Sequence, residues 1–266
     1  MQMKFTGLMA RRMLVNFRVP AEVAQQTLPA GLRPKLVRGY AIAGLCLVRL
    51  ERVRPLGLPA LLGLGSENLA TRMAVEWTQQ RQQKNAVFIF RRDTASPING
   101  ILSEHVGYGV HHRADIHTCD EHGEVAISVR SFDRQQRARA IAQDAGSRIM
   151  RHSVFRTLDE AATFFRGGEC GYSPAREFGR WQGVALRMSR WDLQAMRVEH
   201  AASSLLDTLF VGHAELDSAF IMRNIEHTWM PIGDLPLAQM DANASTRAGC
   251  SIRPAGDKPR QQLAAA

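Results

Sequence analysis

Apolar residues occur in runs that are separated by clusters of Gly, Pro, Asn and Asp along most of the chain. Runs rich in Val, Ile, Leu and Phe between such clusters are typical of β-strands. None of them approaches the ~18 apolar residues that a membrane-spanning helix requires. The strands predicted in this way are residues 13–19, 32–37, 40–53, 69–79, 86–92, 110–119, 124–130, 134–142, 183–188, 193–201 and 220–229.

The predicted helices are few and short. Thr157 and Glu160 have the spacing of a capping box, and Gly167-Gly168 follows as a stop signal, so residues 157–165 are predicted to be a helix. The other predicted helices are residues 21–28, 94–106 and 203–209, with one helical turn within 55–65 and hairpin loops at 79–85 and 120–123. Hairpin-joined strands with occasional helices indicate an α+β fold with a largely antiparallel, closed β-sheet.

The pattern changes after Pro236, where Ala, Gly, Asn, Ser and Arg dominate. We therefore expect one domain over residues 1–236 and a disordered tail over 237–266. The start of the chain lacks the apolar core of a signal peptide, which makes the cytoplasm the expected location.

The formal net charge of +9 comes almost entirely from arginine, because lysine occurs only at positions 4, 35, 84 and 258. Arginine suits bidentate recognition of carboxylates and phosphates. The cysteines at 46, 119, 170 and 250 form no C-x-x-C motif, and we expect free thiols. No cofactor motif is present, and neither a cofactor nor a metal is predicted.

Two short motifs near the start resemble a known family. The V-P-A-E of residues 19–22 is followed by L-P-A-G-L at 28–32 and by G-Y-A at 39–41. These resemble the YqjF-like bacterial proteins of unknown function, which are grouped with the acetoacetate decarboxylase-like fold. The resemblance covers residues 13–229. It implies a β-barrel or cone with a few short peripheral helices and a pocket for a small molecule.

The segment 104–112 carries the most informative part of this resemblance. Acetoacetate decarboxylases have E-x-x-G-[FY]-P-K-K here, where the first lysine forms a Schiff base. Three residues match that pattern: Glu104, Gly107 and Tyr108. Gly109 replaces the proline, Val110 stands at the position of the reactive lysine, and His111-His112 matches the YqjF-like pattern. Because valine has no amine, the resemblance implies the fold and the pocket without the Schiff-base chemistry.

The candidate catalytic residues are Glu104, His111 and His112, because histidine beside a carboxylate can exchange protons near neutral pH. The candidate ligand-binding residues are Glu67, Arg72, Arg92 and Tyr108. Strand alternation places His111 and His112 on opposite faces, and either histidine is equally compatible with a purely structural role.

We expect a protein that binds a small carboxylate or carbonyl compound. Two alternatives stay open at this point. One is a non-catalytic ligand-binding or regulatory scaffold, and the other is a basic protein that contacts nucleic acid through the arginines of residues 130–156. The nucleic-acid class is less favoured, because few aromatic residues lie among these arginines. No membrane partner is expected, and a homo-oligomer stays open.

Overall fold

A wall of five neighbouring strands organises the molecule, a computed structural model that describes residues 3–98 and 109–237. The wall consists of β1 (Phe5–Pro20), β4 (Tyr40–Pro55), β5 (Leu64–Gln79), β6 (Gln82–Thr94) and β13 (Glu215–Pro231). These strands are paired antiparallel in the order β13-β1-β4-β5-β6.

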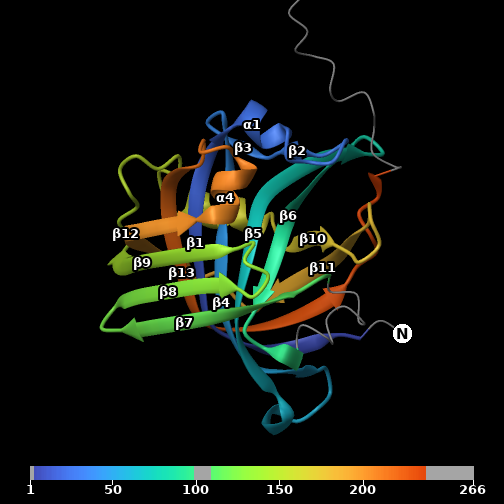
Figure 1. Ribbon diagram of the computed structural model, residues 1–266, viewed down its shortest axis with the longest axis vertical. Helices are drawn as coiled ribbons and strands as arrows, with labels where there is room; N and C mark the ends of the chain where they lie inside the picture. The colour runs from blue at the N-terminus through green and yellow to red at the C-terminus, as the bar shows by residue number, and fades with distance from the viewer. Residues whose placement is uncertain (1–2, 99–108, 238–266) are drawn as a thin grey trace, which may run out of the picture.

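Two strands close the wall into a first ring, which we call the cavity ring. Strand β10 (Cys170–Pro174) pairs with β6, and β11 (Trp181–Met188) pairs with both β10 and β13. The ring therefore runs β13-β1-β4-β5-β6-β10-β11 and back to β13, with β10 and β11 on one side of the wall (Figure 1).

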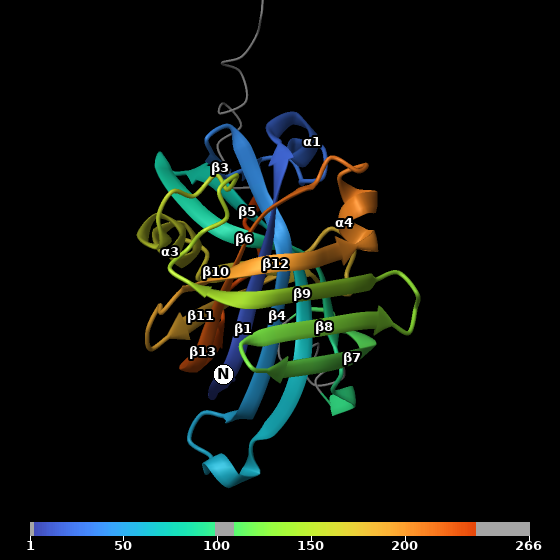
Figure 2. The same ribbon diagram turned by 90° about the vertical axis from the view of Figure 1, so that its left-hand side faces the viewer.

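Four strands close the other side of the wall into a second ring, which we call the packed ring. They are β7 (His112–Glu121), β8 (Glu124–Ser131), β9 (Arg137–Gly146) and β12 (Gln194–Ser203). Strand β7 pairs with β6, and β12 pairs with β13. Figure 2 shows these four strands stacked across the steeply inclined β1 and β4.

Short elements cover the ends of the rings. Helix α3 (Leu158–Arg166) packs its buried Phe164 and Phe165 into the cavity ring side of the core. The remaining elements are α1 (Ala21–Gln25), β2 (Arg33–Pro34), β3 (Leu36–Val37), η1 (Ala60–Leu62) and α4 (Ser204–Leu209). Among the described residues, no helix is long and apolar enough to cross a membrane.

The wall is apolar on both faces because each face lines a different ring. On β1, Met13 and Val15 pack into the core of the packed ring, whereas Leu14 between them packs on the cavity ring side. Strands that are buried on both faces have nearly continuous apolar sequences, as the run around residues 13–19 does.

The predicted α+β class with a closed, largely antiparallel sheet is confirmed. The predicted helix start is also confirmed, since Thr157 Oγ1 accepts a hydrogen bond of 3.1 Å from the Glu160 amide. The Glu160 carboxylate accepts from the Arg156 amide at 2.8 Å, one residue before the position that a capping box would use. The tail 237–266 lies almost entirely outside the described residues, as does most of the helix predicted at 94–106.

Several boundaries differ from the sequence predictions. Strand β1 begins at Phe5 and not at residue 13, and β10 was missed because its five residues include a glycine and a proline. The predicted loop 79–85 is a two-residue turn at Gln80 and Arg81, both with positive φ. A two-residue turn with positive φ matches the twist of a hairpin, and its usual residues are Asn and Gly. Because Gln80 and Arg81 stand here instead, the sequence did not indicate such a tight turn.

Candidate functional site

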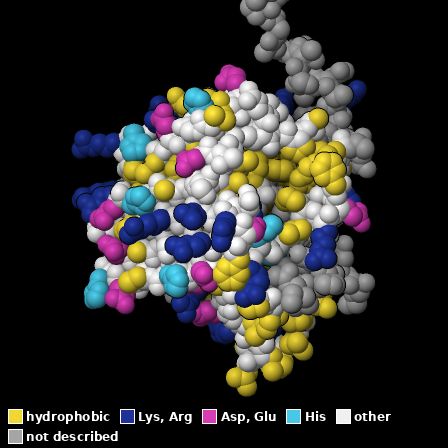
Figure 3. Space-filling view, in the orientation of Figure 1, with side chains coloured by type: hydrophobic (Ala, Val, Ile, Leu, Met, Phe, Trp, Pro, Cys, Tyr) yellow, Lys and Arg dark blue, Asp and Glu magenta, His cyan; other side chains and the backbone are white. Residues whose placement is uncertain are grey.

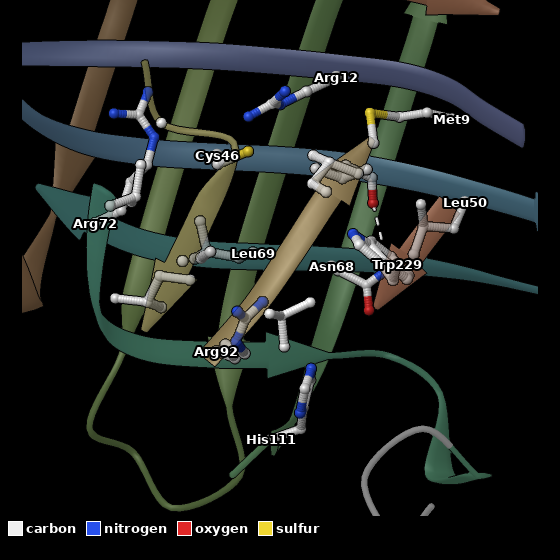
Figure 4. Close-up of a pocket in the computed structure, with 18 of the residues that line it drawn as sticks. Met9, Arg12, Cys46, Leu50, Asn68, Leu69, Arg72, Arg92, His111 and Trp229 are labelled. Carbon is white, nitrogen blue, oxygen red and sulfur yellow. Dashed lines mark hydrogen bonds between the residues drawn. The ribbon is translucent and has the colours of Figure 1, made fainter. Parts of the chain in front are cut away.

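The candidate site is a cavity of about 190 Å³ inside the cavity ring. Apolar side chains from six of the seven strands form most of its wall, among them Met9, Leu69 and Trp229 (Figure 4), while β10 contributes Gly171. Drug-sized ligands occupy pockets of roughly 300 Å³ or more, so this volume suits a smaller molecule.

Three arginines from three different strands reach this apolar cavity: Arg12 of β1, Arg72 of β5 and Arg92 of β6. The side chains of Arg12 and Arg72 are only 8% and 3% exposed, and Arg92 is half-buried. Figure 4 shows all three around the same space.

None of these guanidinium groups has a carboxylate within 4 Å among the described residues. Arg12 contacts the Met188 sulfur at 3.2 Å and lies over the Trp191 ring. Arg72 donates to Asn16 Oδ1 at 2.9 Å, and Arg92 donates to Ser173 Oγ at 3.2 Å. Buried charges are normally paired, so three cations without a carboxylate partner in the described part of the chain make this cavity a candidate anion site.

The two acidic residues at the cavity do not neutralise these arginines. Asp93 is bound by Arg91 at 2.8 Å, and Glu169 forms an ion pair with Arg187. Both carboxylates thus have an arginine partner outside the cavity wall, although Arg91 also binds Asp133. Among the described lining residues, three arginines face two carboxylates.

Burial makes these cations costly for the protein. It lowers the pKa of Arg72 to about 10 and that of Arg92 to about 10, because the charged form loses its hydration. Both side chains are still protonated at neutral pH, and an anion in the cavity would restore the lost stabilisation.

His111 stands at the edge of the same cavity, with its ring pointing towards Arg92 (Figure 4). Its Nδ1 lies 3.1 Å from the Gly109 carbonyl oxygen. A carbonyl oxygen only accepts hydrogen bonds, so Nδ1 carries the proton and Nε2 is an acceptor. Burial, followed by repulsion from Arg92, lowers the pKa of His111 to about 3. The ring is therefore neutral and can accept a hydrogen bond from a ligand hydroxyl group.

His112 and Glu67 do not line this cavity. His112 lies on the other side of the chain and pairs with Asp133 at 3.3 Å. Glu67 points to the face of β5 opposite Asn68, where it binds Arg11 at 2.7 Å. Burial raises the pKa of Glu67, and Arg11 works in the opposite direction. The structure therefore brings together Arg72, Arg92 and His111 of the predicted site residues.

Glu104 and Tyr108 lie outside the described residues. The segment resumes at Gly109, which has φ of +80°. A Cβ atom there would lie 2.2 Å from Ser173 Oγ, the acceptor of Arg92. Proline is restricted to φ near −65°, so this backbone conformation explains why glycine stands at the family's proline position. Val110 lies with Gly109 in a separate, more polar hollow of about 200 Å³, and the Val110 amide donates to the Pro174 carbonyl.

Sequence reasoning missed Arg12 and Cys46, both of which line the cavity. Arg12 was missed because the predicted strand began at residue 13, one position after it, whereas β1 begins at Phe5. Cys46 had no recognisable signal, because a thiol within the apolar strand 40–53 is indistinguishable from an ordinary core residue.

Lysine and arginine side chains gather outside the cavity, over the part of the packed ring that faces the viewer in Figure 3. Arg130 of β8 and Arg137 of β9 are exposed and lie opposite each other. Acidic and histidine side chains are interspersed among them (Figure 3). Nucleic-acid contact by this surface stays a prediction. Among the described residues, no cluster of His, Cys, Asp and Glu is suited to a metal ion.

Comparison with solved structures shows an acetoacetate decarboxylase-like fold. Acetoacetate decarboxylase from Legionella pneumophila superposes with a TM-score of 0.56 at 7% identity, over 86% of this chain and 87% of that one. An acetoacetate decarboxylase-like enzyme from Sphingomonas wittichii RW1 gives 0.57 at 13% identity, over 88% and 94%. The enduracididine biosynthesis enzyme MppR, solved with pyruvate, gives 0.53 at 14% identity, over 89% and 90%. At these identities the likeness concerns the fold alone.

The chain itself belongs to the DUF2071 family, described as "Uncharacterized conserved protein (COG2071)", whose model matches residues 9–219. No curated protein matches the sequence.

Proposed function

We propose that this protein binds a small carboxylate that also carries a carbonyl group, and that it holds this ligand inside the cavity ring. The observation that carries the proposal is the convergence of Arg12, Arg72 and Arg92 on one apolar cavity without a carboxylate partner among the described residues. A guanidinium group matches a carboxylate with two parallel hydrogen bonds.

The dimensions of the site support an anion of a few carbon atoms. A cavity of about 190 Å³ is too small for a nucleotide, and its wall is mostly apolar apart from the arginines. Within the same fold, MppR has been solved with pyruvate and with the condensation product of pyruvate and imidazole 4-carboxaldehyde. Ligands of that size and charge agree with the geometry of this cavity.

The ligand is bound in this proposal without a Schiff base. Lys4, Lys35 and Lys84 are the lysines among the described residues, and none of them lines the cavity. Without an amine at the carbonyl carbon, the imine route to decarboxylation is closed. Neutral His111 then serves as a hydrogen-bond acceptor that orients the ligand.

Calorimetric titration with pyruvate tests the anion site directly. Methyl pyruvate, which has no charge, is the control ligand. We expect pyruvate to bind, and the ester to bind at least about tenfold more weakly, since a charged pair in this cavity is worth 1.4 kcal/mol or more. In a thermal-denaturation assay, pyruvate at 100 times its dissociation constant should add about 2.7 kcal/mol of stability.

The double variant Arg12→Met/Arg92→Met should lose this binding, and Arg139→Met on the exposed face of β9 is the matched control. Equal binding of acid and ester, or pyruvate affinity that survives in the double variant, contradicts the proposal. Borohydride treatment in the presence of pyruvate should leave the protein mass unchanged, whereas a reduced adduct on a lysine contradicts the absence of an imine.

A further inference from the structure

The cavity contains one thiol, and it occupies the centre of the arginine cluster. Cys46 lies on β4 with its side chain 8% exposed, and it is part of the cavity wall. In the sheet register Cys46 is opposite Ala70 of β5, and Ala70 is opposite Arg92 of β6. Only a methyl group therefore separates Cys46 from Arg92 along this row.

The other two arginines flank this row on the same face of the wall. Arg72 is two residues from Ala70 on β5, and Arg12 is two residues from Leu14, which is opposite Cys46 on β1. Positions related in this way are diagonal neighbours within reach of long side chains. Figure 4 shows Cys46 between Arg12 and Arg72. Burial lowers the pKa of both Arg72 and Arg92.

Arginines from three strands therefore surround Cys46 in the cavity wall. The other two described cysteines lack such surroundings. Cys119 is exposed on β7, on the far side of the wall, and burial raises the pKa of Cys170 on β10. The arginines that attract an anion are therefore the same groups that surround Cys46.

We propose that the Cys46 thiol adds reversibly to the carbonyl carbon of a 2-oxo acid held by the arginines. A sulfur–carbon bond forms while the π pair of the C=O bond moves to oxygen, and the thiol proton ends on that oxygen. The product is a hemithioketal, and the step requires no oxidant, reductant or further reactant. Arg92 lies along the register row from Cys46, where its guanidinium can stabilise the developing oxyanion. This inference rests on the proposed function, because the arginines must first bind the acid.

Alkylation with iodoacetate and with uncharged iodoacetamide tests the location and the charge preference of this thiol. In both reactions sulfur bonds to the CH₂ carbon as iodide leaves, so the two reagents differ mainly in charge. We expect Cys46 to favour iodoacetate over iodoacetamide at least about tenfold more than exposed Cys119 does in the same sample, by peptide mass spectrometry. Pyruvate should protect Cys46 and leave Cys119 unaffected.

In Arg12→Met/Arg92→Met, the preference of Cys46 should fall to that of Cys119. The variant Ala70→Leu, which removes no charge but fills the space between Cys46 and Arg92, should slow alkylation of Cys46 by both reagents. An unreactive Cys46 in protein whose Cys119 reacts overturns the proposal, as does a preference that persists in the double variant.

Carbon NMR of bound [2-¹³C]pyruvate observes the adduct itself. The labelled carbon should move from the ketone region into the region of tetrahedral carbons with wild-type protein, and stay a ketone with Cys46→Ser, which should still bind pyruvate in calorimetry. Binding with only a ketone signal in the wild type leaves the carboxylate site standing and overturns the role of Cys46. Absence of pyruvate binding by the wild type overturns both.

Discussion

At the scale of one residue, Arg12 allows the stability cost of the proposed anion site to be predicted. Its guanidinium is 8% exposed and contacts only a thioether and an indole ring among the described residues. A buried ion without a charged partner stabilises a fold less than an apolar side chain of similar length does. Arg12 is therefore the arginine to replace in a stability test. Replacing Arg72 would also leave buried Asn16 Oδ1 without its donor.

We expect Arg12→Met to raise the free energy of unfolding by about 1 to 2 kcal/mol while weakening pyruvate binding. Urea unfolding at pH 7 measures the first effect and calorimetry the second. The exposed Arg139→Met should change stability by less than about 0.5 kcal/mol. A destabilised Arg12→Met would show that the indole and sulfur contacts outweigh the burial of the charge.

His227 of β13 links stability to pH through a single side chain. It is 3% exposed, neither ring nitrogen forms a hydrogen bond of good geometry within the described residues, and its ring packs 4.6 Å from that of Trp229. Burial, followed by repulsion from Arg12, lowers the pKa of His227 to about 4. Between pH 6.5 and 4 the unfolded chain therefore binds a proton that the folded protein does not, so stability falls as the pH falls.

Between pH 7 and pH 5, this histidine should account for about 2 kcal/mol of lost stability, which His227→Phe should remove. His111 acts in the same direction because its pKa is also lowered, whereas Asp93, whose pKa burial raises to about 6, opposes both. Urea midpoints at the two pH values measure the difference. Parallel losses in wild type and variant would mean that His227 is protonated in the folded state.

The sequence identified several candidate site residues, but it did not show in which direction each side chain points. Arg72, Arg92 and His111 were proposed as site residues and do reach one cavity, but Glu67 belongs to the opposite face. Glu67 and Arg72 are five positions apart on β5, whose pairing with β4 is uninterrupted there, so alternation places their side chains on opposite faces. The sequence alone did not show which face of β5 would line the cavity.

At the scale of an element, β1 and β4 depend on one glycine. A Cβ atom on Gly44 would lie 2.1 Å from the Val15 carbonyl oxygen, within the antiparallel pairing of the two strands. Backbone atoms in a paired strand cannot move away independently. We expect Gly44→Ala to cost more than about 3 kcal/mol of unfolding free energy, measured by urea denaturation.

Gly65→Ala in β5 is the matched control, because its Cβ atom would meet a single backbone oxygen at 3.4 Å, an ordinary contact. Its cost should stay below about 1 kcal/mol, and comparable losses in the two variants would contradict the steric explanation. Nothing in the sequence around residue 44 signals this contact, whereas the N-terminal cap of α3 was recognisable because its partners are three residues apart.

At the scale of the whole molecule, the sequence predicted that the β-sheet closes, but not that it closes into two rings. Local hairpin signals and the family resemblance indicated one closed sheet, and the sheet is closed. Division into two rings depends on pairings between distant strands, namely β6 with β10, β6 with β7, and β11 with β13. Such pairings have no local sequence signal, because they depend on packing against the two faces of the wall and not on turn residues.

The two rings also differ in how firmly they are joined to the wall, and this difference predicts their dynamics. Strands β1 and β4 are paired along nearly their whole length. The packed ring is joined to the wall by two residue pairs between β6 and β7 and by three between β12 and β13. We therefore expect the amides of β7 and β8 to exchange hydrogen faster than those of β1 and β4, through openings that leave the wall intact.

Pyruvate distinguishes these openings from global unfolding in a hydrogen-exchange mass spectrometry experiment. A ligand slows exchange only through states that cannot bind it. Opening of β7 and β8 keeps the strands of the cavity ring that carry Arg12, Arg72 and Arg92, so exchange in β7 and β8 should be unchanged by pyruvate. Exchange in β1 and β4 should slow by about 100-fold at 100 times the dissociation constant, because those amides are exposed only when the cavity is lost. Equal slowing in all strands would show instead that the two rings unfold as a single cooperative unit.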